Sequence, residues 1–281
     1  MSAGATVLLG AIAGLTIFIG LPVARLRTLS RKAQGFLTVI ATGILFFLLW
    51  DVLSEASEPV EHALDGVHKG LVGEFAGMAA VFAVGITVGL LSLVAVNRRF
   101  AGVLRRPSPQ PLGGPGAALA AKAAEPTALA TGRSLAVMIA VGLGLHNFSE
   151  GLAIGQASVS GALSFAVVLI IGFGLHNVTE GFGIAAPATS DTTRPSWAFL
   201  LLVGLVGGGP TFVGTVVGYS VNSPYVFVLF LTLAAGALLY VINEMLHVGR
   251  LLTSRVALAA GLLLGFLVAY GTDLLLVFAG S

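Results

Sequence analysis

The sequence predicts an all-α polytopic membrane protein with eight transmembrane helices and both termini outside. Its composition calls for a lipid environment: 57% of the 281 residues are hydrophobic and only 9% are charged, whereas about 25% are charged in a soluble domain. The apolar runs are continuous and long enough to cross about 30 Å of hydrocarbon, whereas the strands of a membrane β-barrel would alternate. The whole chain, residues 1–281, is expected to form one transmembrane domain.

Eight apolar runs define the predicted helices. They cover residues 6–24, 36–54, 71–96, 134–155, 161–188, 197–219, 225–247 and 256–279. The loops between them are short except for residues 97–133, whose Pro, Gly and Ala content predicts a flexible cytoplasmic linker. No basic residue precedes the first run, so a cleaved signal peptide is not expected.

The basic residues set the predicted orientation. Thirteen of the fourteen Lys and Arg residues fall on one side of the membrane, with Lys69 the exception, and this side is therefore predicted to be cytoplasmic. They are Arg25, Arg27, Arg31, Lys32, Arg98, Arg99, Arg105, Arg106, Lys122, Arg133, Arg194, Arg250 and Arg255. The net charge is only +2, so nucleic acid is not an expected partner. The absence of cysteine excludes thiolate ligands and disulfides.

A short polar motif occurs twice within the apolar runs. Residues 146–151 read HNFSEG and residues 176–181 read HNVTEG, and the surrounding residues 141–155 match residues 171–185 at eight of fifteen positions. On a helix, His and Glu four residues apart share one face, and Asn falls on the same arc. Each copy is therefore predicted to direct an imidazole, a carboxylate and an amide oxygen to one region.

Both copies are expected near the middle of the bilayer. At 1.5 Å per residue, His146 lies about 18 Å from the inner end of its run, and His176 about 22 Å from the outer end of the next. An ionised Glu at this depth costs about 2.5–3.5 kcal/mol or more unless it is compensated. Core packing explains a single buried His or Glu more easily than it explains the same set twice. The doubled motif therefore predicts a divalent-metal site formed by His146, Asn147, Glu150, His176, Asn177 and Glu180.

Two further acidic regions can be interpreted either as ordinary solvated or interfacial groups or as parts of a metal pathway. The predicted outer loop after the second run collects Glu55, Glu58, Glu61, His62, Asp65 and His68. This loop is either simply solvated or serves to concentrate cations at an entrance. Glu244, in the seventh run, either extends to the inner interface or belongs to a second metal position or to the exit path.

At the paired motifs the sequence resembles the ZIP (Zrt/Irt-like protein) family of divalent metal transporters. Eight runs, outward termini and a long cytoplasmic loop after the third run fit the same pattern, so the resemblance covers nearly the whole chain. It implies that zinc, iron, manganese or a similar ion passes toward the cytoplasm between the fourth and fifth helices. It also implies that Glu244 corresponds to a seventh-helix carboxylate of the family, which makes a two-metal arrangement plausible.

The sequence departs from the family pattern at two features. Members usually carry proline before the motif glutamate, where this chain has Ser149 and Thr179. Without proline the helices are expected to be less kinked, and the hydroxyls can join the coordination. The long loop contains no histidine, which argues against metal sensing through it.

The predicted function is transport of a divalent metal rather than catalysis, with the metal as substrate and no cofactor. Imidazole, carboxylate and amide donors without sulfur suit Zn, Fe, Mn, Co, Ni or Cd better than Cu(I). The expected partners are the metal ion, the lipid bilayer of the cell membrane and, from Gly-rich helices and the resemblance, a second copy of the chain. The alternatives are an intramembrane metal-dependent hydrolase and a membrane metal sensor. A hydrolase lacks a third deep histidine or aspartate, and a sensor lacks a soluble output domain.

Overall fold

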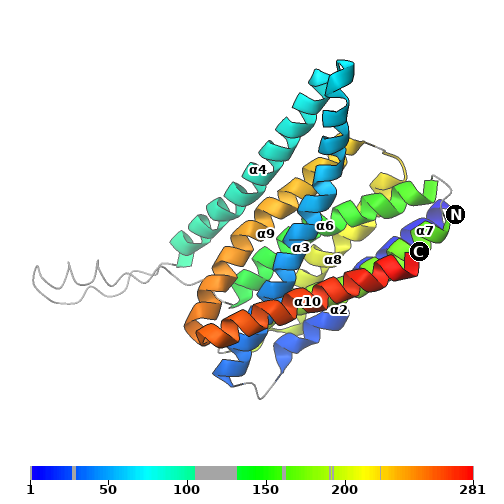
Figure 1. Cartoon of the computed structure of the whole chain (residues 1–281). Helices are drawn as coiled ribbons and strands as arrows, with labels where there is room; N and C mark the ends of the chain where they lie inside the picture. Colours follow the sequence, from blue (N-terminus) through cyan, green and yellow to red (C-terminus); the bar gives the residue numbers. More distant parts are fainter. Residues whose placement is uncertain are drawn as a thin grey trace, which may run out of the picture.

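The computed structural model shows a bundle of long helices (Figure 1) and describes residues 2–26, 30–104, 132–159, 163–189, 191, 193–221 and 223–280. Within these residues there is no strand, and the predicted all-α class is confirmed. The elements are α1 (Ala3–Leu15), α2 (Ile17–Gly20), η1 (Leu21–Arg25), α3 (Arg31–Asp65), η2 (Val67–Lys69), α4 (Val72–Leu104), α6 (Gly132–Val159), α7 (Leu163–Ala188), α8 (Trp197–Gly218), α9 (Pro224–Leu252) and α10 (Arg255–Gly280).

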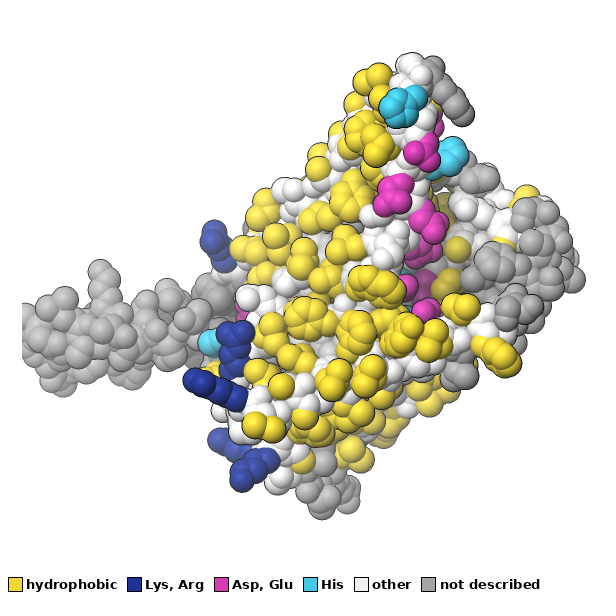
Figure 2. Space-filling view, viewed as in Figure 1, with side chains coloured by type: hydrophobic (Ala, Val, Ile, Leu, Met, Phe, Trp, Pro, Cys, Tyr) yellow, Lys and Arg dark blue, Asp and Glu magenta, His cyan; other side chains and the backbone are white. Residues whose placement is uncertain are grey.

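The helices have the length and hydropathy of membrane spans. Seven segments of the described chain are long and apolar enough to cross a bilayer, and α7 is a further helix of 26 residues. Large apolar side chains cover much of the face seen in Figure 2. Exposed examples on α10 are Leu263 and Val277. Such a surface requires lipid, because water would leave this apolar area uncompensated. The protein is therefore an integral multi-pass membrane protein.

The region after the second predicted run is a helix, so the predicted acidic outer loop is wrong. Helix α3 is 35 residues long and continues to Asp65, so that it carries all four acidic residues assigned to the loop. Ser30 caps its start by accepting a hydrogen bond from the Ala33 amide at 3.2 Å. The chain turns only at Gly66 and at Gly70, whose positive φ of 87° suits glycine.

The predicted linker at residues 97–133 is shorter than expected. Helix α4 extends to Leu104 and α6 begins at Gly132. The rest of the predicted linker, residues 105–131, lies outside the described residues. The first predicted run is also divided, because the helix is interrupted at Thr16 and ends in the 3-10 turn η1.

The two ends of the chain lie at the same end of the bundle, away from the α9–α10 connection (Figure 1). Lys and Arg side chains gather at the other end, where α3 begins and α9 ends (Figure 2). Arg31 and Lys32 lie at the start of α3, and Arg250 and Arg255 flank the α9–α10 connection. This separation fits an even number of crossings and the charge asymmetry on which the orientation was predicted.

The helices pack as two groups. In the first group α6 packs mainly on α8, and α1 and α2 pack on α7 and α8. In the second group α9 packs on α3 and α4, and α10 packs on α3. The groups meet where α6 contacts α9 and where α7 contacts α3 and α10. The two motif-bearing helices α6 and α7 therefore lie at the boundary between the groups.

Glycines bring helices into close backbone contact within each group. A Cβ added to Gly151 or Gly181 would overlap a carbonyl oxygen of the first group, and one added to Gly43 or Gly236 would overlap a carbonyl oxygen of the second. Across the boundary, among the described glycines, only Gly142 approaches the other group, with ordinary van der Waals contact. Close backbone contact at glycines thus occurs within each group, whereas side chains pack the boundary between the groups.

Candidate metal centre

Both motifs lie at the middle of their helices. Helix α6 has 28 residues, and His146 and Glu150 occupy its central turns. Helix α7 has 26 residues, and His176 and Glu180 are placed equivalently. The helices are consecutive and pack against each other, so the two donor sets meet at one depth. The sequence prediction that these four residues converge agrees with this geometry.

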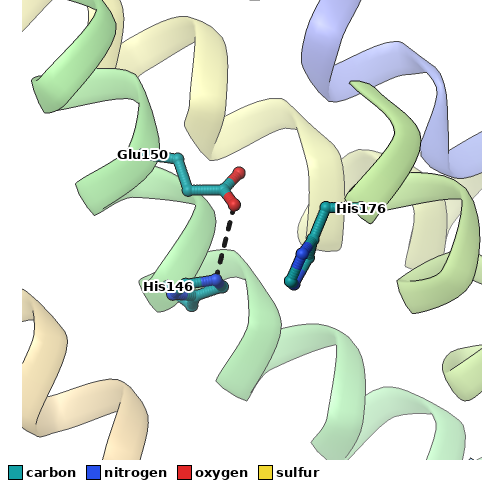
Figure 3. Close-up of side chains that lie close together, drawn as sticks. All are labelled: His146, Glu150 and His176. Atoms are coloured by element: carbon teal, nitrogen blue, oxygen red, sulfur yellow. Dashed lines mark ion pairs between the residues drawn. The ribbon is translucent and has the colours of Figure 1, made fainter. Parts of the chain in front are cut away.

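His146 and Glu150 of α6 and His176 of α7 lie close together between the two helices (Figure 3), and Glu180 joins this cluster. Nε2 of His146 lies 3.4 Å from Oε1 of Glu150 and 3.8 Å from Oε1 of Glu180. Nε2 of His176 lies 3.9 Å from the same Glu180 oxygen, which therefore sits between the two imidazoles. One donor atom each from His146, Glu150 and His176 lies within 4.8 Å of the other two. A single ion can bridge donors at these separations after small side-chain rotations.

The cluster is excluded from solvent, yet many of its polar atoms have no hydrogen-bond partner. The four residues are at most 4% exposed. Buried atoms without a hydrogen bond include Nε2 of both histidines, Oε2 of Glu150 and Oε1 of Glu180. Leaving buried polar atoms unpaired costs about 1–3 kcal/mol each, and charged groups cost more. Such a concentration of free nitrogen and oxygen donors is the arrangement that a bound cation would stabilise.

The two asparagines of the motifs are fully buried and donate to different partners. Nδ2 of Asn147 donates to Oε2 of Glu180 at 2.8 Å and to the Gly207 carbonyl of α8 at 3.1 Å. Nδ2 of Asn177 donates to the Ala13 carbonyl of α1 at 3.0 Å. In both residues Oδ1 is buried without a hydrogen bond. Each amide oxygen is therefore a buried acceptor without a partner, and its use as a metal ligand stays a prediction.

The motif hydroxyls bond to their own helices. Ser149 Oγ donates to the Leu145 carbonyl at 3.4 Å, and Thr179 Oγ1 donates to the His176 carbonyl at 2.7 Å. Neither helix is interrupted at these positions, which fits the expectation for motifs without proline before the glutamate; the proline of α7 lies farther on, at Pro187. The hydroxyls thus take part in local backbone bonding here.

A row of acidic side chains on α3 leads toward the cluster (Figure 2). Asp51, Glu55, Glu58 and Asp65 recur at intervals of three, four and seven residues, so they share one face of the helix. Glu58 and Asp65 are exposed, whereas Asp51 and Glu55 are half-buried. The inner end of the row, at Asp51 and Glu55, lies within electrostatic range of His146 and Glu150.

Glu244 is separate from the cluster. It is half-buried on α9 and is not among the residues whose donor atoms come together. The sequence reasoning also missed two groups next to the centre, namely the carbonyls of Gly207 and Ala13, to which the asparagines donate. No side-chain signal could have identified these groups, because any residue carries a carbonyl. The glycine-rich stretch at residues 207–209 was an indirect sign of close packing.

The cluster brings together two imidazoles and two carboxylates, which are donor types that bind divalent metals. This set suits a borderline divalent ion, since imidazole nitrogen and carboxylate oxygen both bind Zn²⁺ and its neighbours. The buried His and Glu group can therefore bind a metal inside the helical bundle. No model of a known protein family matches the chain, and no curated protein matches it.

Proposed function

We propose that the protein is a divalent metal cation transporter of the ZIP (Zrt/Irt-like protein) type, which moves metal toward the cytoplasm through the centre between α6 and α7. One observation carries the proposal: two matched His and Glu pairs meet at the middle of neighbouring spans, fully buried, with donor atoms that have no hydrogen-bond partner. Ionisable groups inside a membrane mark ion pathways more often than they stabilise a fold.

The charge of the cluster favours a divalent ion as the substrate. Two ionised glutamates, Glu150 and Glu180, match the +2 charge of such an ion, while neutral histidines add nitrogen donors. The two carboxylates interact with histidines rather than with a lysine or arginine within the ion pairs of the described residues. A bound metal would replace these His–Glu contacts with stronger metal–ligand contacts. All four side chains would then contribute to a site from which water is already excluded.

The acidic row on α3 supports a route from the outer side. It begins at exposed residues near the α3–α4 turn and ends at Asp51 and Glu55, within electrostatic range of the cluster. A line of negative charge raises the local cation concentration and speeds association. An inside-negative potential adds about 4.6 kcal/mol per 100 mV for two charges that cross alone. The acidic row thus speeds arrival of the metal at the outer entrance, and the potential favours its movement toward the cytoplasmic side.

The two-group architecture supports an alternating-access mechanism. The cluster lies on α6 and α7, which belong to one group and face the other. Because close backbone contacts at glycines occur within the groups, whereas side chains pack the boundary between them, the first group can shift against the second while its donor set stays intact. Such relative movement around a midplane site is the general mode of secondary transporters.

Uptake of ⁶⁵Zn²⁺ into proteoliposomes tests this function. The wild type should give saturable uptake, and Glu150→Gln and Glu180→Gln should each lower it by about tenfold or more, because each removes one charge and one ligand. Glu74→Gln, which changes an exposed carboxylate on α4, is the matched control and should leave uptake unchanged. Wild-type rates in the Glu150→Gln and Glu180→Gln variants would refute the assignment.

A further inference from the structure

Each motif has two faces, and the second face binds a partner helix. His and Glu face the centre, while Asn and the final Gly, also four residues apart, face a neighbour in the same group. On α6, Asn147 donates to the Gly207 carbonyl and Gly151 lies against the Thr211 carbonyl, both on α8. The Asn and Gly positions therefore hold α6 on α8 through main-chain contacts.

Helix α7 repeats this arrangement on the first helix. Asn177 donates to the Ala13 carbonyl of α1, and Gly181 lies against the Ile17 carbonyl of α2. The same spacing of 194 residues separates Ala13 from Gly207 and Ile17 from Thr211. Equivalent residues of the two motifs thus contact equivalent residues of the two partner helices.

The partner helices also meet each other symmetrically. A Cβ on Gly14 would overlap the Gly208 carbonyl, and a Cβ on Gly208 would overlap the Gly14 carbonyl. Residues 10–20 and 204–214 carry identical residues at Gly10/Gly204, Gly14/Gly208, Phe18/Phe212 and Gly20/Gly214. Reciprocal contacts of this kind are expected around an approximate two-fold axis. The pairing of α6 with α8 and of α7 with α1 is therefore a repeated structural unit.

The interruption of the first helix lies at the contact with Asn177. The helix breaks at Thr16, whose hydroxyl oxygen lies 2.7 Å from the Ala13 carbonyl oxygen and 2.6 Å from the Gly174 carbonyl oxygen of α7. The Ala13 carbonyl oxygen thus contacts both the Thr16 hydroxyl and the Asn177 amide nitrogen. This contact fixes the amide nitrogen of Asn177 one residue away from the ligand His176.

We propose that Asn147 and Asn177 are positioning residues, whose amide nitrogens hold the ligand helices on α8 and α1 and so set the directions of the His and Glu donors. The proposal rests on the metal-binding function proposed above. Asn147 also orients Glu180 directly, because it donates to Oε2 and leaves Oε1 between the two imidazoles. Because hydrogen bonds hold the two amide nitrogens, each Oδ1 is the amide atom that has no hydrogen-bond partner.

Replacement of Asn177 by Asp separates this role from that of a simple ligand. Asp keeps an oxygen donor and nearly the same shape, but it removes the N–H that binds the Ala13 carbonyl and places two acceptors against each other. A residue that acts only as a ligand would bind metal as well or better with the added charge. A positioning residue should lose about 10- to 100-fold in metal affinity, as outer groups of metal sites do.

The experiment titrates the purified full-length protein in nanodiscs with Co²⁺ and records the visible absorption of the bound ion. The wild type should bind Co²⁺, and Asn177→Asp should bind about 10- to 100-fold more weakly with an altered spectrum. Asn243→Asp, at an exposed position on α9, is the matched control and should match the wild type in both measurements.

A disulfide tests whether the lost contact with α1 is the cause. The chain has no cysteine, and a Cβ at Gly174 would lie 3.6 Å from Cγ2 of Thr16, so Thr16→Cys with Gly174→Cys can join the α1–α2 junction covalently to α7. In the Asn177→Asp background the oxidised pair should restore affinity to within about threefold of wild type, since a restored geometry recovers the positioning effect. Wild-type affinity and spectrum in Asn177→Asp, or no recovery on oxidation, would overturn the proposal. Absence of Co²⁺ binding by the wild type would instead overturn the metal-binding function itself.

Discussion

Joining the two helix groups covalently should stop metal transport without removing the metal centre. Gly142 on α6 and Ala237 on α9 face each other across the boundary, and a Cβ at position 142 would lie 3.4 Å from that of Ala237. Disulfides require Cβ atoms about 3.5–4.5 Å apart, so Gly142→Cys with Ala237→Cys needs an adjustment of only about 0.1 Å. Because the chain has no cysteine, no other disulfide can form within one molecule.

The expected loss of transport rate follows from the packing of the helices in two groups. If the groups must shift relative to each other in every cycle, the oxidised protein should transport metal at least about tenfold more slowly, which corresponds to about 1.4 kcal/mol or more on the barrier. Equilibrium metal binding should change by less than about threefold, because Gly142 lies one helical turn from the nearest ligand. Reduction should restore the rate.

The assay is zinc uptake by proteoliposomes before oxidation with diamide, after it, and after reduction, with the extent of crosslinking measured by mass spectrometry. Gly261→Cys with Val39→Cys is the matched control, since a Cβ at position 261 would lie 3.2 Å from that of Val39 and the pair joins α10 to α3 within the second group. It should crosslink and still transport. Wild-type uptake by a fully crosslinked Gly142→Cys and Ala237→Cys protein would refute the relative motion of the groups.

Three further predictions concern packing, electrostatics and helix capping. Gly181→Ala should weaken Co²⁺ binding and lower the thermal unfolding temperature, because its Cβ overlaps the Ile17 carbonyl and overpacking costs about 1–3 kcal/mol; Gly183→Ala, whose Cβ meets nothing within 4 Å, should do neither. Asp51→Asn removes one charge from the acidic row, so it should slow uptake at subsaturating zinc by about threefold at low salt. The slowing should be smaller at high salt, because salt screens the charge. Equal slowing at all ionic strengths would contradict this prediction. Asp191→Ala should reduce the unfolding free energy by about 0.5–2 kcal/mol in a denaturant titration, because its carboxylate accepts from the Gly132 and Arg133 amides at the start of α6; an unchanged midpoint would argue against the cap.

Hydropathy was enough to predict the helices, because each span must satisfy its backbone polar groups internally in lipid. The convergence of His146, Glu150, His176 and Glu180 was also predictable. Two copies of one motif at mid-depth on consecutive antiparallel spans leave little choice of where the donors meet. For these features local sequence determines the geometry.

The continuation of α3 was not predicted, because acidic residues after an apolar run were interpreted as a loop. Glu, Ala and Leu are strong helix formers, and the run from Ser54 to Asp65 is rich in them. The partners of the asparagines could not be found from sequence either. They are main-chain carbonyls on helices far along the chain, and only the packing of α1 and α8 brings them to the motifs.

The most direct test of the central claim is the coordination of bound zinc, measured by X-ray absorption at the zinc edge. The sample should be a variant with His62→Gln, His68→Gln and His247→Gln, which leaves only the two motif histidines. We predict nitrogen and oxygen ligands at about 2.0–2.2 Å, with imidazole scattering that decreases when His146 or His176 is replaced by alanine. A bound zinc whose spectrum shows no imidazole, or does not respond to either replacement, would contradict a metal centre between α6 and α7.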